Sequence, residues 1–158
     1  MSFLDRLKNL FADLSGADGD DPAPAFADGD HRLAAAALAF HLIAVDGVVE
    51  DVERERLRDI LKARYDLDDA ETEELMELAR LKDLEAVDLY GFTSILKRAL
   101  DEDQRGGVVE MLWELVYADG TVHEFEDNVV WRVAELLGVS PRERIRLRQI
   151  VEAREEDT

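Results

Sequence analysis

Residues 44–53 read Ala-Val-Asp-Gly-Val-Val-Glu-Asp-Val-Glu, and residues 117–126 read Tyr-Ala-Asp-Gly-Thr-Val-His-Glu-Phe-Glu. The two stretches share the pattern Asp-Gly-x-Val-x-x-x-Glu, with the Asp and the Glu seven residues apart in both copies. An apolar stretch precedes each copy, and a charged stretch with helical spacing follows it. Two acidic turns in matching settings predict a helical domain with a pseudo-twofold internal repeat.

The repeat extends beyond the two turns at the same sequence offset. The matched pairs are Leu42 with Leu115, Leu57 with Val130, Ile60 with Val133, and His41 with Glu114. No segment shows the alternation of apolar and polar residues that is typical of paired strands. The sequence therefore predicts an all-α domain of about seven helices, built from two related halves.

Helical spacing and composition divide the chain into three parts. Residues 1–14 are predicted to form a short amphipathic helix, whose apolar stripe consists of Phe3, Leu7, Leu10, Phe11 and Leu14. Residues 15–30 form an acidic linker rich in Pro and Gly, and residues 31–158 form the helical domain. In that domain the expected helices run over 32–45, 52–65, 68–81, about 84–100, 108–118, through 129–137, and from 140 to about 155.

Helix signals at particular positions support these boundaries. Asp68 with Glu71, and Ser140 with Glu143, have the spacing of capping boxes, and Gly138 is a typical residue for a helix end. Two further residues, Trp113 and Trp131, fall at core-facing spacing and are predicted to pack inside the domain.

The charge of the chain limits its ligands. Asp and Glu number 38 against 19 Lys and Arg, which gives a formal net charge of −19. Such a field repels the phosphates of nucleic acids and favours cations or basic protein partners, so we expect no nucleic-acid ligand. Because the chain has no cysteine, disulfides and thiolate metal sites are excluded. No apolar run approaches the roughly 20 residues that span a bilayer, and we expect a cytoplasmic protein.

Three interpretations of the segment at residues 1–14 stay open: contact with a membrane surface, docking in a partner groove, or folding back onto its own domain. Its polar face sets Asp5 and Asp13 against Arg6 and Lys8. This face gives no net attraction to acidic lipid, whereas interfacial helices are usually rich in Lys and Arg, so peripheral membrane contact is the disfavoured interpretation.

The twin turns resemble the second half of an EF-hand calcium loop, in which Gly permits a sharp turn and the last Glu closes the cation bidentately. The first half of such a loop is missing, because the first ligand positions would fall on Leu42 and Leu115, which cannot coordinate a cation. A self-sufficient EF-hand is therefore excluded in both copies. A shared site remains open if the turns face each other and pool four acids: Asp46, Glu53, Asp119 and Glu126.

Helix capping is the alternative explanation of the same residues. An Asp at a helix end, a Gly in the left-handed conformation and a Glu in the next first turn make a helix–turn–helix joint without any metal.

The doubled motif, the apolar helices before it and the Leu-Gly-Val ending of the helix after the second copy resemble the tellurite-resistance TerB family. That family is grouped with the N-terminal domain of the DjlA co-chaperone. The resemblance covers roughly residues 31–155. It implies an all-helical fold with pseudo-twofold character, a metal site at the four acids named above, and a sensor or scaffold role in stress response.

Catalysis has little support in the sequence. There is no cysteine nucleophile, no serine lies in a nucleophile-elbow pattern, and three histidines are too scattered for a zinc site. We therefore expect a non-enzymatic module that binds a divalent cation, Ca²⁺ or Mg²⁺ rather than Zn²⁺, and a protein partner. The alternatives are a purely structural interaction module and, more remotely, a metal-dependent hydrolase. The sequence does not define the oligomeric state.

Overall fold

The computed structural model of the chain describes residues 26–27, 29–44, 49–86, 88–119 and 124–156. Seven α-helices and one short 3-10 helix occupy nearly all of these ranges, and none of the described residues is in a strand. The elements are α2 (His31–Ile43), α3 (Asp51–Tyr65), α4 (Asp69–Glu85), α5 (Tyr90–Ala99), α6 (Glu102–Val116), η1 (Tyr117–Asp119), α7 (Glu124–Leu137) and α8 (Pro141–Glu156).

The predicted all-α domain of about seven helices is confirmed. The predicted helix at residues 1–14 and most of the linker at 15–30 lie outside the described residues, so the division into three parts stays a prediction. The same is true of the pseudo-twofold relation between the two halves. None of the described helices is long and apolar enough to cross a membrane.

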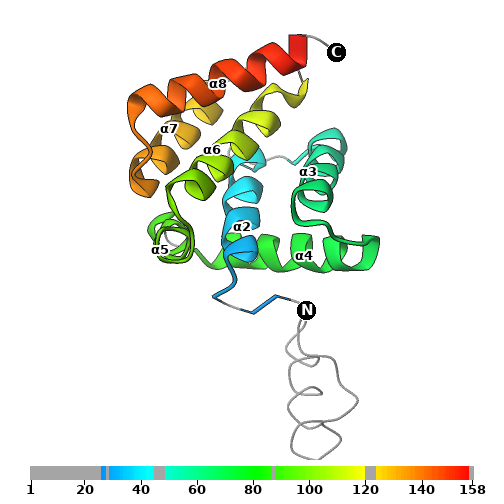
Figure 1. The fold of residues 1–158 in the computed structure, drawn as a ribbon. Coiled ribbons are helices and arrows are strands. Elements are labelled where there is room, and N and C mark those ends of the chain that lie inside the picture. Colours follow the sequence, from blue (N-terminus) through cyan, green and yellow to red (C-terminus); the bar gives the residue numbers. More distant parts are fainter. Residues whose placement is uncertain (1–25, 28, 45–48, 87, 120–123, 157–158) are drawn as a thin grey trace, which may run out of the picture.

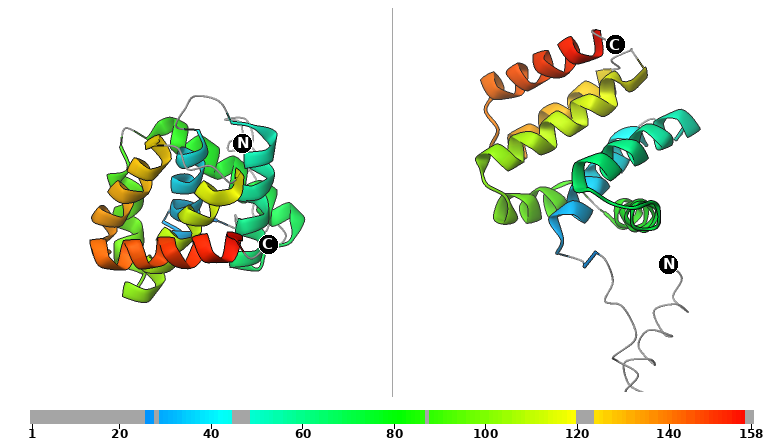
Figure 2. Two further views of the ribbon diagram at one scale, coloured as in Figure 1. Left: turned by 90° about the horizontal axis from the view of Figure 1, so that it is seen from above. Right: turned by 45° about the vertical axis from the view of Figure 1, so that its right-hand side comes forward.

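Helix α2 lies at the centre of the domain (Figures 1 and 2). Ten of its 13 residues are buried, and its surface is covered by α3, α4, α5, α6 and α7. Five of the buried residues are alanines, whose small side chains allow neighbouring helices to approach the α2 backbone closely. A helix that is apolar on every side is expected to be buried, and α2 has this sequence and this position.

Helix α6 is the second buried helix, and it packs against α7 and α8 as well as α2 and α3. Its largest core side chain is Trp113, which is 1% exposed. With α7 and α8 it forms the upper part of the molecule in Figure 1. The packing role predicted for Trp113 is confirmed.

Trp131 differs from its prediction. Its side chain is 46% exposed on α7, and the guanidinium of Arg144 from α8 lies 5.3 Å from the centre of its ring. Helical spacing indicates a face of the helix, but it does not show where the neighbouring helix stops covering that face.

Two helix boundaries were predicted wrongly. The expected helix at 84–100 is divided, because α4 continues through Glu85 and α5 begins only at Tyr90, whose backbone N–H donates to the Asp88 carboxylate at 3.0 Å. The helix expected from 108 begins at Glu102. Its start is fixed by a reciprocal capping box between Asp101 and Gln104, with distances of 2.8 and 2.9 Å.

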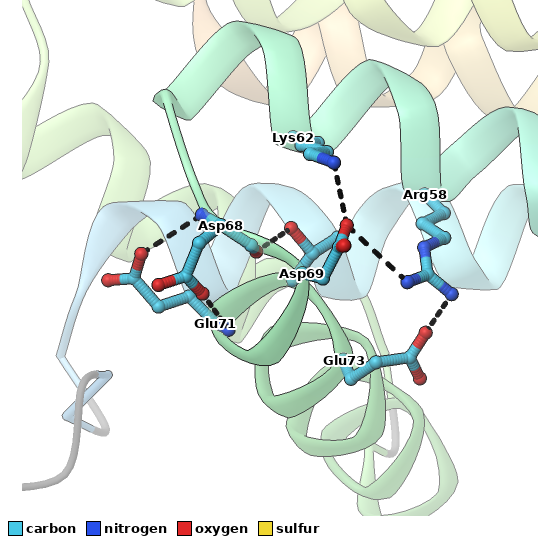
Figure 3. A network of polar contacts seen from close by, with 7 residues as sticks. Arg58, Lys62, Asp68, Asp69, Glu71 and Glu73 are labelled. Atoms are coloured by element: carbon cyan, nitrogen blue, oxygen red, sulfur yellow. Dashed lines mark hydrogen bonds and ion pairs between the residues drawn. The ribbon is translucent and has the colours of Figure 1, made fainter.

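The predicted caps are confirmed. Asp68 and Glu71 form a reciprocal capping box at 2.7 and 3.0 Å, and the Ser140 hydroxyl accepts a hydrogen bond from the Glu143 backbone N–H at 3.1 Å. Gly138 ends α7 with φ of +77°. Figure 3 shows the first of these caps beside the salt bridges that join α3 to α4.

The turn between α3 and α4 contains a strained residue. Asp66 has φ of +52°, in the left-handed region that L-residues other than Gly rarely adopt. After this residue, the backbone N–H of Leu67 donates to the Lys62 carbonyl at 3.0 Å, and the Lys62 ammonium donates to the Asp69 carboxylate at 2.6 Å. The fold holds Asp66 in this conformation because α4 must pack back against α3.

We predict that Asp66→Gly raises the free energy of unfolding by about 0.5 kcal/mol, because Gly removes the left-handed strain at a modest cost in chain entropy. The matched control, Ala63→Gly in the exposed last turn of α3, should lower it by about 1 kcal/mol. Urea unfolding at pH 7 measures both. Equal destabilisation by the two substitutions would contradict this explanation of the turn.

The start of α2 depends on Asp30 and Arg32. The Asp30 carboxylate accepts from the Arg32 backbone N–H at 2.8 Å and pairs with its guanidinium at 2.8 Å. Burial alone would raise the pKa of Asp30, but the hydrogen bonds and charge of Arg32 lower it below the ordinary value. Arg32 also covers the ring of Phe26 at 4.6 Å. Phe26 belongs to the predicted linker, yet it is buried in the core.

Because the folded-state pKa of Asp30 is lowered, its contribution to stability is complete above the unfolded pKa of about 3.9 and is lost as the pH falls through the folded value. We therefore predict that Asp30→Asn is less stable than the wild type at pH 7, and that the difference disappears near pH 2. Thermal unfolding of both proteins across this range tests the sign. A difference that is constant with pH would contradict the role of the charge.

Candidate functional site

The four acids predicted as metal ligands belong to two equivalent joints in the chain. Glu53 is the third residue of α3 and Glu126 is the third residue of α7, and both side chains are partly buried. Asp119 is the last residue of η1. Asp46 lies outside the described residues, as do Gly47 and Gly120. The two Glu residues thus occupy the same position in their helices, in the first turn after each motif.

Glu53 has a capping contact. Its carboxylate accepts a hydrogen bond from the backbone N–H of Glu50 at 3.4 Å, which is long and weak. Glu53 also has an interaction partner besides this hydrogen bond, and Glu126 has an interaction partner of its own.

The valine of the first Asp-Gly-x-Val pattern, Val49, contributes to core packing. Val49 is partly buried and packs against the hydrophobic core. It therefore anchors the end of the first turn just before α3 begins at Asp51.

One surface hollow joins parts of both motifs. It has a volume of about 420 Å³ and includes Asp51, Val52 and Glu55 from the first turns of α3, together with Ala118 from η1. Helix α3 also contacts η1 directly. The fold therefore brings the helix after the first motif beside the start of the second motif.

Within the described ranges, no group of three or more His, Asp or Glu side chains is arranged to hold a metal ion. The side chains of Asp46 and Asp119 lie outside that search. The four-acid site consequently stays a prediction.

Each motif exposes an apolar side chain at the same position. Val52 is 67% exposed in the first turn of α3, and Phe125 is 69% exposed in the first turn of α7. They occupy matching places immediately before Glu53 and Glu126. Sequence analysis did not identify these residues, although an apolar residue between acids in both copies was a visible signal.

Arg148 of α8 holds the second joint together. Its Nε donates to the Tyr117 hydroxyl at 2.8 Å, its Nη1 donates to the Asp127 carboxylate at 3.1 Å, and its guanidinium lies 5.0 Å from the ring centre of Trp113. The hydrogen bond with Tyr117 and the neighbouring carboxylates raise the pKa of Arg148. One side chain thereby connects α8 with η1, α7 and α6.

Two matched positions of the repeat make cross-helix contacts. His41 on α2 lies 2.9 Å from the Asp83 carboxylate on α4, and Glu114 on α6 pairs with Arg64 on α3 at 3.2 Å. Both His41 and Glu114 are partly exposed. Helix α3 is held to α8 by a further ion pair, between Arg56 and Glu155 at 3.0 Å.

These features define a class of protein: an all-helical domain in which two buried helices each lead into an acidic turn and a charged helix. Comparison with models of protein families identifies the family to which this domain belongs. The family described as "Tellurite resistance protein TerB" matches residues 32–149, which is most of the chain, and the chain therefore belongs to the tellurite-resistance TerB family. Comparisons with curated proteins and with solved structures gave no match.

We predict that Arg148→Lys lowers the free energy of unfolding by about 1 kcal/mol, because Lys cannot bond in two directions while stacking on Trp113. The control is Arg146→Lys, which removes one exposed pair with Glu143 and should change stability by less than about 0.5 kcal/mol. Chemical denaturation measures both values, and the role assigned to Arg148 requires that they differ.

Proposed function

We propose that this TerB-family domain is a cytoplasmic, non-enzymatic module that binds a divalent cation between its two acidic turns and acts as a sensor or scaffold for protein partners. Asp46 and Asp119 would be the central ligands, and Glu53 and Glu126 the closing ligands. Oxygen ligands of this kind suit Ca²⁺ or Mg²⁺ better than Zn²⁺.

The observation that carries the proposal is the approach of the two joints. The hollow between the first turns of α3 and η1 is lined by three acids and one arginine (Asp51, Glu55, Asp59 and Arg56) together with Val52 and Ala118, and this mainly acidic lining supports a shared cation site. The identical placement of Glu53 and Glu126, third in their helices, gives additional support. Cation binding there would relieve repulsion between acids in a chain of net charge −19.

The capping alternative is favoured by a specific contact, the bond from Glu50 N–H to Glu53. In that case the acids only satisfy free N–H groups and complement the helix dipoles. The domain would then be a structural interaction module. A metal-dependent hydrolase is a more distant alternative, since it would need an open pocket and a general base that the sequence does not identify.

The first experiment is a thermal melt of chelator-stripped protein titrated with Ca²⁺, Mg²⁺, Mn²⁺ or Zn²⁺. A specific site predicts a saturable stabilisation of about 2.7 kcal/mol when the free cation reaches one hundred times its Kd. Asp46→Asn combined with Asp119→Asn should abolish this response and leave the fold intact.

The matched control is Asp103→Asn combined with Glu135→Gln, which removes the same charge from exposed positions on α6 and α7 that do not line the hollow beside η1. It should retain the cation response. If the wild type shows no response to millimolar cation, and Asp46→Ala combined with Asp119→Ala loses about 0.5–2 kcal/mol per lost cap, the capping alternative is correct.

A further inference from the structure

An apolar groove opens at the opposite end of α2 from the first acidic turn. It lies between the first turn of α2, the end of α4 and α5, and its volume is about 290 Å³. The residues that give it its apolar character are Leu33, Ala34, Ala86, Gly91, Phe92 and Ile95. We call it the α2–α4–α5 groove.

Two exposed apolar side chains are next in sequence to residues of this groove. Leu84 and Tyr90, which are next in sequence to the lining residues Glu85 and Gly91, are 70% and 66% exposed. A Cβ atom built on Gly91 would meet nothing within 4 Å, so the wall formed by α5 has open space in front of it.

Two other hollows on the described residues have a different character. The hollow between α3 and α4 is lined by Arg54, Arg58, Glu73 and other charged side chains. The hollow between α6 and α8 is lined by Glu102, Glu110 and further acids. Of these three hollows, the α2–α4–α5 groove would accommodate an apolar helix face best.

We propose that the apolar stripe of residues 1–14 packs into the α2–α4–α5 groove, so that the chain covers this face with its own N-terminal segment. The segment, which lies outside the described residues, has five apolar side chains at helical spacing and would be about 21 Å long as a helix. Phe3, Leu7, Leu10, Phe11 and Leu14 would supply the contacts.

The place where the chain enters the domain favours this occupant. Phe26 is buried, with Arg32 over its ring, and Leu33 of the groove follows only one helical turn after Asp30. The intervening residues 15–25 span about 18 Å as a flexible chain and at most about 40 Å when extended. A tether of this length gives an effective concentration in the millimolar range.

Charge disfavours a bilayer as the alternative occupant. Asp5 and Asp13 balance Arg6 and Lys8, so the side chains of residues 1–14 carry no net charge. The linker at 15–30 adds five Asp and no Lys or Arg. Anionic lipid would repel this linker, whereas a segment without net charge meets no repulsion from a groove whose rim carries Lys82, Glu85 and Asp88.

The absence of cysteine allows a direct test in the full chain. A spin label on Asn9→Cys, opposite the apolar stripe, should remove most of the amide NMR intensity of Leu33, Gly91 and Phe92. Leu7→Gln with Leu10→Gln should restore that intensity without changing the melting temperature of the domain. The polar-face control, Asp5→Asn with Lys8→Gln, should leave the attenuation as it is.

Three results would overturn the proposal. The first is the absence of attenuation at the groove. The second is full attenuation in isotope-labelled wild type that carries no spin label when it is mixed with an excess of spin-labelled protein, which would identify a second copy as the occupant. The third is attenuation that appears only with anionic vesicles, which would identify a membrane-bound state. None of these results depends on whether the acidic turns bind a cation.

Discussion

Burial of α2 on every side is the constraint on which the arrangement of the other helices depends. Its alanines at positions 35–37 and Leu38 are completely inaccessible to solvent. A helix with this sequence is stable only when other helices cover its entire circumference, and five helices do so here. The small side chains set short distances to those neighbours, and the domain around α2 follows from their close packing.

The polar contacts orient helices that hydrophobic burial has already brought together. Exposed ion pairs such as Arg64 with Glu114 contribute little stability individually, but each restricts the rotation of one helix against another. Arg148 differs because it bonds in two directions and stacks on a buried ring. It fixes the joint after the second buried helix, where one candidate ligand, Asp119, is the last residue of η1.

The acidic joints show why capping and cation binding are difficult to separate. The N-terminus of a helix carries partial positive charge and free N–H groups, so acids are favoured there with or without a metal. Glu53 and Glu126 occupy the same third position of their helices, which suits both roles. The exposed Val52 and Phe125 beside them fit neither role, and they place apolar surface next to the acids.

Periodicity in the sequence by itself determined the all-α class, the two buried helices and most caps, because these depend on side chains close together along the chain. The boundary between α4 and α5, the exposure of Trp131 and the burial of Phe26 could not be determined in this way. They depend on where another helix ends or covers a surface, which only tertiary packing decides. The candidate site follows the same division: local spacing indicated the acids, whereas the approach of η1 to α3 arises from the packing of the two buried helices.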